Sequence, residues 1–126
     1  MSLVLDSGAL IALEKNDRAM WRRLKTALLA KRVPVTHGGV VGQAWRGGGP
    51  RQALLAQALS GIDVRSLDEN LGRASGSLLA RNDGVDVIDA ALVLLADDGD
   101  DIVTSDPEDL ESLATQLGRH VELLRV

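Results

Sequence analysis

The chain has 126 residues, enough for one domain with a single buried core. It contains no Cys, which excludes disulfides, thiolate metal sites and a Cys nucleophile, and with two Trp and no Phe or Tyr its core has to be aliphatic. The net charge of −4 divides into +6 over residues 1–60 and −10 over residues 61–126, so the first half suits an anionic polymer and the second attracts cations.

Short apolar segments alternate along the chain with longer segments of helical spacing. The expected strands cover residues 3–5, 33–36, 62–67, 102–104 and 121–126. The expected helices cover residues 10–13, 16–32, 40–46, 51–60, 68–82, 86–98 and 107–117. This alternation predicts an α/β fold with a parallel sheet and helices on both faces. No repeat or linker divides the chain, so residues 1–126 are expected to form one domain.

Two further expectations concern location. No apolar segment is long enough for a transmembrane helix, so no membrane association is expected. The N-terminal segment lacks the basic leader of a signal peptide, and its short apolar run is interrupted by Asp6. A cytoplasmic protein is therefore expected, in agreement with the absence of Cys.

Acidic residues gather where expected strands end. Asp6 directly follows the first expected strand, and Asp106 follows the fourth in the same way. Parallel strands bring their carboxyl ends to one edge, where ligands bind in open α/β folds. Asp86 and Asp89 share a face at the start of an apolar helix, and if that helix start packs at the same edge, three or four carboxylates meet there.

Each of these acids alone has a simpler interpretation as a helix cap. As a cluster, however, carboxylates repel one another unless a cation lies between them. Mg²⁺ and Mn²⁺ prefer such oxygen ligands, so the cluster predicts a divalent-metal site suited to phosphate chemistry.

Four segments in succession resemble the motifs of PIN domains, especially the toxin components of VapBC-type toxin–antitoxin modules. They are LVLDSGALIALE (3–14), VVGQAWR (40–46), VDVIDAALVLLA (85–96) and IVTSDPEDL (102–110). The resemblance implies a three-layer α/β/α PIN-like fold with a central parallel sheet. It implies a Mg²⁺- or Mn²⁺-dependent endoribonuclease that cleaves RNA phosphodiester bonds. It also implies a VapB-like antitoxin as a partner, and a homodimer.

The same resemblance assigns roles to individual residues. Metal binding and catalysis fall on Asp6, Asp89 and Asp106. The second acidic position of the family falls on Gln43, where PIN domains usually have Glu, and this is the main departure from the pattern. The residues expected to support the site are Gln43, Asp86, Thr104, Ser105 and Asp109. In such a site the metal lowers the pKa of a bound water and stabilises charge on the scissile phosphate.

Basic residues of the first half are candidates for RNA contact. Arg46, Arg22 and Arg23 could meet phosphates, although the last two could equally lie on a solvated helix face. Trp45 could stack on an RNA base, but with so few aromatic residues a core or interface anchor is the stronger interpretation. His37 is expected to have a structural or surface role.

Two other functions remain open at this stage. Gln43 removes one negative charge from the site, which favours a PIN-fold protein that binds RNA or a partner with weak or no nuclease activity. A phosphatase-like hydrolase of small phosphate esters would use the same strand-end aspartates. It is disfavoured because no nucleophile-plus-acid motif occupies the short loop after Asp6. The RNA target cannot be read from the residues.

Overall fold

Five short parallel strands form the centre of the molecule in a computed structural model that describes residues 1–126. The strands are β1 (Leu3–Leu5), β2 (Val35–His37), β3 (Asp63–Arg65), β4 (Asp101–Thr104) and β5 (Glu122–Arg125). Their order across the sheet is β3-β2-β1-β4-β5, and every neighbouring pair is parallel. The five predicted strands are thereby confirmed, with β2 beginning two residues later than expected.

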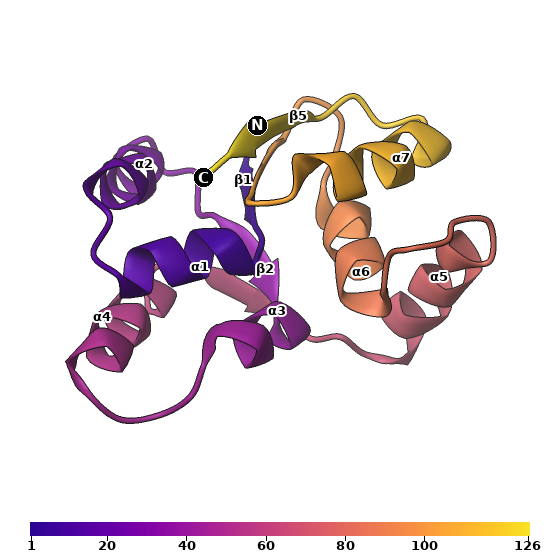
Figure 1. The fold of residues 1–126 in the computed structure, drawn as a ribbon. Coiled ribbons are helices and arrows are strands. Elements are labelled where there is room, and N and C mark those ends of the chain that lie inside the picture. The colour runs from indigo at the N-terminus through magenta and orange to yellow at the C-terminus, as the bar shows by residue number, and fades with distance from the viewer.

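Seven helices join the strands and cover both faces of the sheet. They are α1 (Ser7–Glu14), α2 (Arg18–Leu29), α3 (Gly38–Ala44), α4 (Pro50–Leu59), α5 (Glu69–Leu79), α6 (Val87–Leu95) and α7 (Pro107–Leu117). Helices α1, α2 and α4 lie together on one side, and α5, α6 and α7 lie on the other (Figure 1). The result is the predicted three-layer α/β/α architecture.

The strand order reverses at β1. The chain moves from β1 outward through β2 to β3, and then returns to the other side of β1 to add β4 and β5. In open α/β sheets a ligand crevice forms at such a reversal, outside the carboxyl ends of the two strands. Leu5 is paired with Val103 in the register of β1 and β4. The segments that leave these two strands therefore begin side by side.

The core between these layers is aliphatic, as the composition requires. Its largest fully buried side chains are Leu, Ile and Met, with His37 as the one large polar member. Aspartates begin most of the helices. Asp17, Asp68 and Asp86 each accept a hydrogen bond from a backbone N–H in the first turn of a helix. None of the helices has the length and apolar character needed to cross a membrane.

Candidate functional site

Asp6 is the buried centre of the carboxyl edge of the sheet. It follows β1 directly, and only 5% of the residue is exposed. One carboxylate oxygen, Oδ1, accepts a 2.8 Å hydrogen bond from the backbone N–H of Ser7 and so caps α1. The other, Oδ2, accepts a 2.7 Å hydrogen bond from the Thr104 hydroxyl. The Asp6 side chain therefore caps α1, and this capping bond does not exclude the predicted functional role of the same side chain.

Thr104 connects Asp6 to Asp106. It is fully buried at the end of β4, and its Oγ1 accepts a 3.0 Å hydrogen bond from the backbone N–H of Asp106 while its hydrogen goes to Asp6. Asp106 begins α7, but its side chain makes no capping hydrogen bond. Its exposed carboxylate only receives a long, 3.4 Å contact from the Ser105 hydroxyl. Asp106 therefore occupies the expected N-cap position of α7 without a side-chain capping bond, and its carboxylate is available to a ligand.

The loops after β1 and β4 touch at Gly8. A methyl group placed on Gly8 would lie 2.7 Å from Ser105 Oγ and 2.9 Å from Ser105 N. Such distances are shorter than real contacts to a Cβ atom, so only Gly allows the first turn of α1 to approach the β4 loop this closely. The Asp-Ser-Gly segment of the first motif thus fits directly against the Thr-Ser-Asp segment of the last.

Asp89 lies within electrostatic reach of Asp6. Burial, the neighbouring Asp86 carboxylate and the Asp6 carboxylate together raise the pKa of Asp89 from 3.8 to about 6. Asp86 is the N-cap of α6, and its Oδ1 accepts a 3.0 Å hydrogen bond from the Asp89 N–H. The capping interpretation is confirmed for Asp86, and burial together with two neighbouring carboxylates disfavours the charged form of Asp89.

The other predicted supporting residues are less closely tied to the carboxylates. Gln43 lies on α3, partly exposed, and Asp109 lies on the exposed side of the first turn of α7. No group of three or more His, Asp or Glu side chains is arranged to hold a metal ion. The structure brings Asp6 and Asp89 together and attaches Asp106 beside them through Thr104. That all three bind one ion stays a prediction.

The donor atoms nevertheless suit a hard cation. The ligand atoms on offer are all oxygens, which Mg²⁺ and Mn²⁺ prefer. They belong to Asp6, Asp89, Asp106, Thr104 and Gln43. A divalent ion would also relieve the repulsion that raises the pKa of Asp89.

His37 has a structural role beside the site that the sequence did not specify. It is fully buried, and its Nδ1 accepts a 3.1 Å hydrogen bond from the Gly39 N–H at the start of α3. Its Nε2 therefore carries the proton and donates at 3.0 Å to the carbonyl of Ile88, next to Asp89. His37 thus fixes the start of α6 against the end of β2.

Gln52 is a second residue that the sequence analysis missed. It is buried on α4, where its Oε1 accepts hydrogen bonds from the backbone N–H groups of Arg46 and Gly47 and its Nε2 donates to Glu14. These bonds anchor the loop after α3 to the C-terminal end of α1. The available signal was spacing, since Gln52 shares one helical face with the core residues Leu55 and Ala58.

The predicted RNA-contact residues do not all lie near the acids. Arg46 is exposed and donates from Nη1 to the carbonyls of Gly42 and Trp45, which satisfies the end of α3. Arg22 and Arg23 lie on α2 beside the amino ends of β1 and β4, at the opposite end of the strands. Trp45 is 40% exposed, so of its two expected roles it does not anchor the core, and an interface role stays a prediction.

Comparison with known proteins supports the fold. No family model matches the sequence, and no curated protein matches it significantly. The architecture and the strand-end carboxylates define a PIN-like α/β/α fold. A solved structure with this fold is that of VapBC2 from Rickettsia felis bound to a DNA fragment from their promoter. It superposes with a TM-score of 0.69 over 98% of both chains, at 15% sequence identity.

Proposed function

We propose that this protein is a PIN-type endoribonuclease that requires Mg²⁺ or Mn²⁺ and acts as the toxin of a toxin–antitoxin pair. The observation that carries the proposal is the buried carboxylate of Asp6 at the reversal of strand order, held by Thr104 and close to Asp89. Likeness of fold to a chain of VapBC2 supports the same class of protein. Four motifs resemble those of PIN toxins in the same order along the chain, and this resemblance supports RNA cleavage as the reaction.

In this function Asp6, Asp89 and Asp106 hold the cation. When bound, a divalent cation there would supply a water of lowered pKa and positive charge beside the scissile phosphate. Thr104 keeps the Asp6 carboxylate in one orientation by its 2.7 Å hydrogen bond. One of the three carboxylates can instead orient the attacking water. Neither Cys nor a titrating His is needed.

The partner of this toxin would be a VapB-like antitoxin, and the chain would form a homodimer in the cytoplasm. A groove of about 620 Å³ between α2 and α4 suits an antitoxin segment, because it combines Trp21, Leu29 and Leu54 with three basic side chains. Leu29 is 86% exposed on this surface. An acidic amphipathic segment would cover the apolar groups and neutralise the cations. Leu24 is buried and cannot contribute to any interface.

A non-catalytic function is the second candidate, and Gln43 favours it. An amide at this position supplies an oxygen without a charge, so the site attracts a cation less strongly than four acids would. Such a protein would bind RNA or a partner through the PIN fold and cleave slowly or not at all.

A cleavage assay separates the two candidates. Purified protein is incubated with a panel of structured and single-stranded RNAs in Mn²⁺, in Mg²⁺ and in EDTA, beside the Asp6→Asn variant. Asp83→Asn is the matched control, because Asp83 is an exposed loop residue. Cation-dependent cleavage by the wild type and the control, lost in Asp6→Asn, supports the nuclease. RNA binding without cleavage under every condition supports the second candidate and overturns the first.

A further inference from the structure

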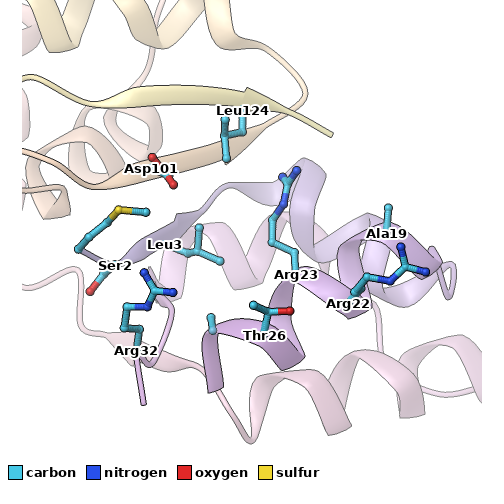
Figure 2. A pocket seen from close by; sticks show the side chains of 11 residues that line it. Ser2, Leu3, Ala19, Arg22, Arg23, Thr26, Arg32, Asp101 and Leu124 are labelled. Atoms are coloured by element: carbon cyan, nitrogen blue, oxygen red, sulfur yellow. The ribbon is translucent and has the colours of Figure 1, made fainter. Parts of the chain in front are cut away.

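A second pocket lies at the end of the sheet opposite Asp6. It has a volume of about 370 Å³ and is enclosed by α2 and its following loop on one side and by the amino ends of β1 and β4 on the other. Figure 2 shows Arg23, from α2, and Arg32, from the loop after α2, reaching toward the pocket, with Asp101 and Leu124 above it. Nothing in the proposed nuclease chemistry uses this pocket.

The sheet register explains why the pocket exists. Leu3 is paired with Asp101, and Leu124 is paired with Val103 one pleat further along, so these side chains share one face. A space remains on this face between α2 with its following loop and the residues Leu3, Asp101 and Leu124 of the sheet. Leu3, Ala27 and Leu124 thus form an apolar wall that solvent can reach.

The charge of the pocket is unusual. Arg22, Arg23 and Arg32 line it, and none of the three takes part in an ion pair. The single acid in the lining is Asp101. Burial, Glu122 and Asp100 raise the pKa of its carboxyl group, while Arg23 and Arg32 act in the opposite direction. Three guanidinium groups therefore face a partly apolar space with one carboxyl group among them.

We propose that this pocket binds a small organic anion, a carboxylate or a phosphomonoester with an apolar body. The anionic group lies between Arg23 and Arg32, since guanidinium groups form paired hydrogen bonds with carboxylate and phosphate oxygens. The apolar body packs on Leu3, Ala27 and Leu124. The volume is that of a small-ligand site.

Two features select a small anion over RNA. No aromatic side chain lines the pocket, so no base can stack there, although stacking is the usual source of affinity for single strands. The basic residues also enclose a compact space, where a polymer backbone needs a continuous track. Asp101 sets the selectivity, because its negative charge opposes an anion and so favours ligands that also offer a hydrogen-bond donor.

The experiment uses phenyl phosphate, hexanoate and inorganic phosphate as probes. Binding is measured by isothermal titration, and the site is located by methyl shifts of Leu3 and Leu124 in NMR spectra. Phenyl phosphate and hexanoate should bind saturably, and inorganic phosphate at least about tenfold more weakly because it has no apolar body. The double variant Arg23→Gln/Arg32→Gln should lose binding at least about tenfold, with an unchanged circular dichroism spectrum.

Two further variants make the test selective. Arg51→Gln removes an exposed guanidinium from α4 outside the pocket, and it should bind all probes like the wild type. Asp101→Asn removes the opposing charge and should bind phenyl phosphate roughly three- to tenfold more tightly. If Arg51→Gln and the double variant lose probe binding equally, the loss comes from the change in overall charge, and the proposal is overturned. Absence of saturable binding, or displacement of phenyl phosphate by a single-stranded oligonucleotide at lower concentration than by hexanoate, would overturn it as well.

Discussion

The Thr104 hydroxyl donates a 2.7 Å hydrogen bond to Asp6 Oδ2, across 98 positions of sequence. The same oxygen of Thr104 accepts from the Asp106 N–H, so one side chain orders both acids that follow the central strands. Asp6, which is only 5% exposed, thus accepts one hydrogen bond from the Ser7 N–H and one from the Thr104 hydroxyl. The candidate site is therefore built from a hydroxyl as much as from carboxylates.

Replacing this hydroxyl tests its contribution. Thr104→Val keeps the shape but leaves Asp6 Oδ2 and the Asp106 N–H without their partners. We expect the free energy of unfolding to fall by about 1–3 kcal/mol. Thr104→Ser keeps the hydroxyl and should lose distinctly less. Urea denaturation of the metal-free proteins measures both changes. Equal losses in the two variants would show that the methyl group matters and the hydrogen bonds do not.

Gly8→Ala should destabilise the protein by roughly 1–3 kcal/mol, because the added methyl group meets the backbone nitrogen of Ser105, which cannot move aside alone. Gly76→Ala in α5 is the matched control. Its methyl group would meet nothing within 4 Å, so it should stabilise by about 0.5–1 kcal/mol through helix propensity. Thermal unfolding of the two variants compares the same substitution in two helices. A stabilised Gly8→Ala would contradict the contact with Ser105.

Asp89 should make the metal-free protein less stable as the pH rises. Its pKa is about 6 in the folded state against 3.8 ordinarily, so between these values the folded state keeps a proton that the unfolded state has lost. Stability is then fully present below about pH 4 and declines up to about pH 6. The shift corresponds to about 3 kcal/mol at most, and partial exposure and coupling reduce our expectation to roughly 1–2 kcal/mol.

Asp89→Asn removes this penalty. It should match the wild type near pH 4 and exceed its free energy of unfolding by roughly 1–2 kcal/mol at pH 7. Denaturation in EDTA at both pH values gives the comparison, with the exposed Asp83→Asn as control. Parallel pH dependences in Asp89→Asn and wild type would show that Asp89 carries no such penalty.

Gln43→Glu should raise the affinity for Mn²⁺, by roughly tenfold, because it restores one negative charge beside a cation held by the three aspartates. RNA cleavage should rise with it if the nuclease proposal holds. Gln57→Glu, an exposed residue on α4, provides an equal change of net charge. Titration calorimetry measures the affinities. An unchanged affinity in Gln43→Glu would mean that Gln43 does not face the metal and that the second motif is misaligned.

Much of the fold was readable from the sequence because each element carries a local signal. The central strand β1 is a continuous run of aliphatic residues, and aspartates mark the helix starts at Asp17, Asp68 and Asp86. Strand-end position also identified Asp6 and Asp106. The parallel sheet was predicted from alternation and the resemblance together, whereas the order of its strands comes from the structure.

The missing parts depend on tertiary contacts. The partners of Gln52 lie on two other segments, the loop at Arg46 and Gly47 and the end of α1 at Glu14, so no local pattern shows them. His37 accepts from Gly39 and donates to Ile88, 51 positions away, and only the packed fold reveals that pair. The basic residues of α2 gave no sign of which end of the sheet they face. Their place beside Leu3 and Asp101 follows from where the helix packs.

The position of β1 between β2 and β4 has a consequence during synthesis. Asp6 is made before its partner Thr104, which is added 98 residues later, and β1 has no β4 to pair with until then. At a translation rate of about 5–20 residues per second, this interval lasts about 5–20 s. A growing chain that has not yet reached Thr104 therefore lacks the hydrogen bond that orders the Asp6 carboxylate, and the carboxylates can assemble only after β4 has been made.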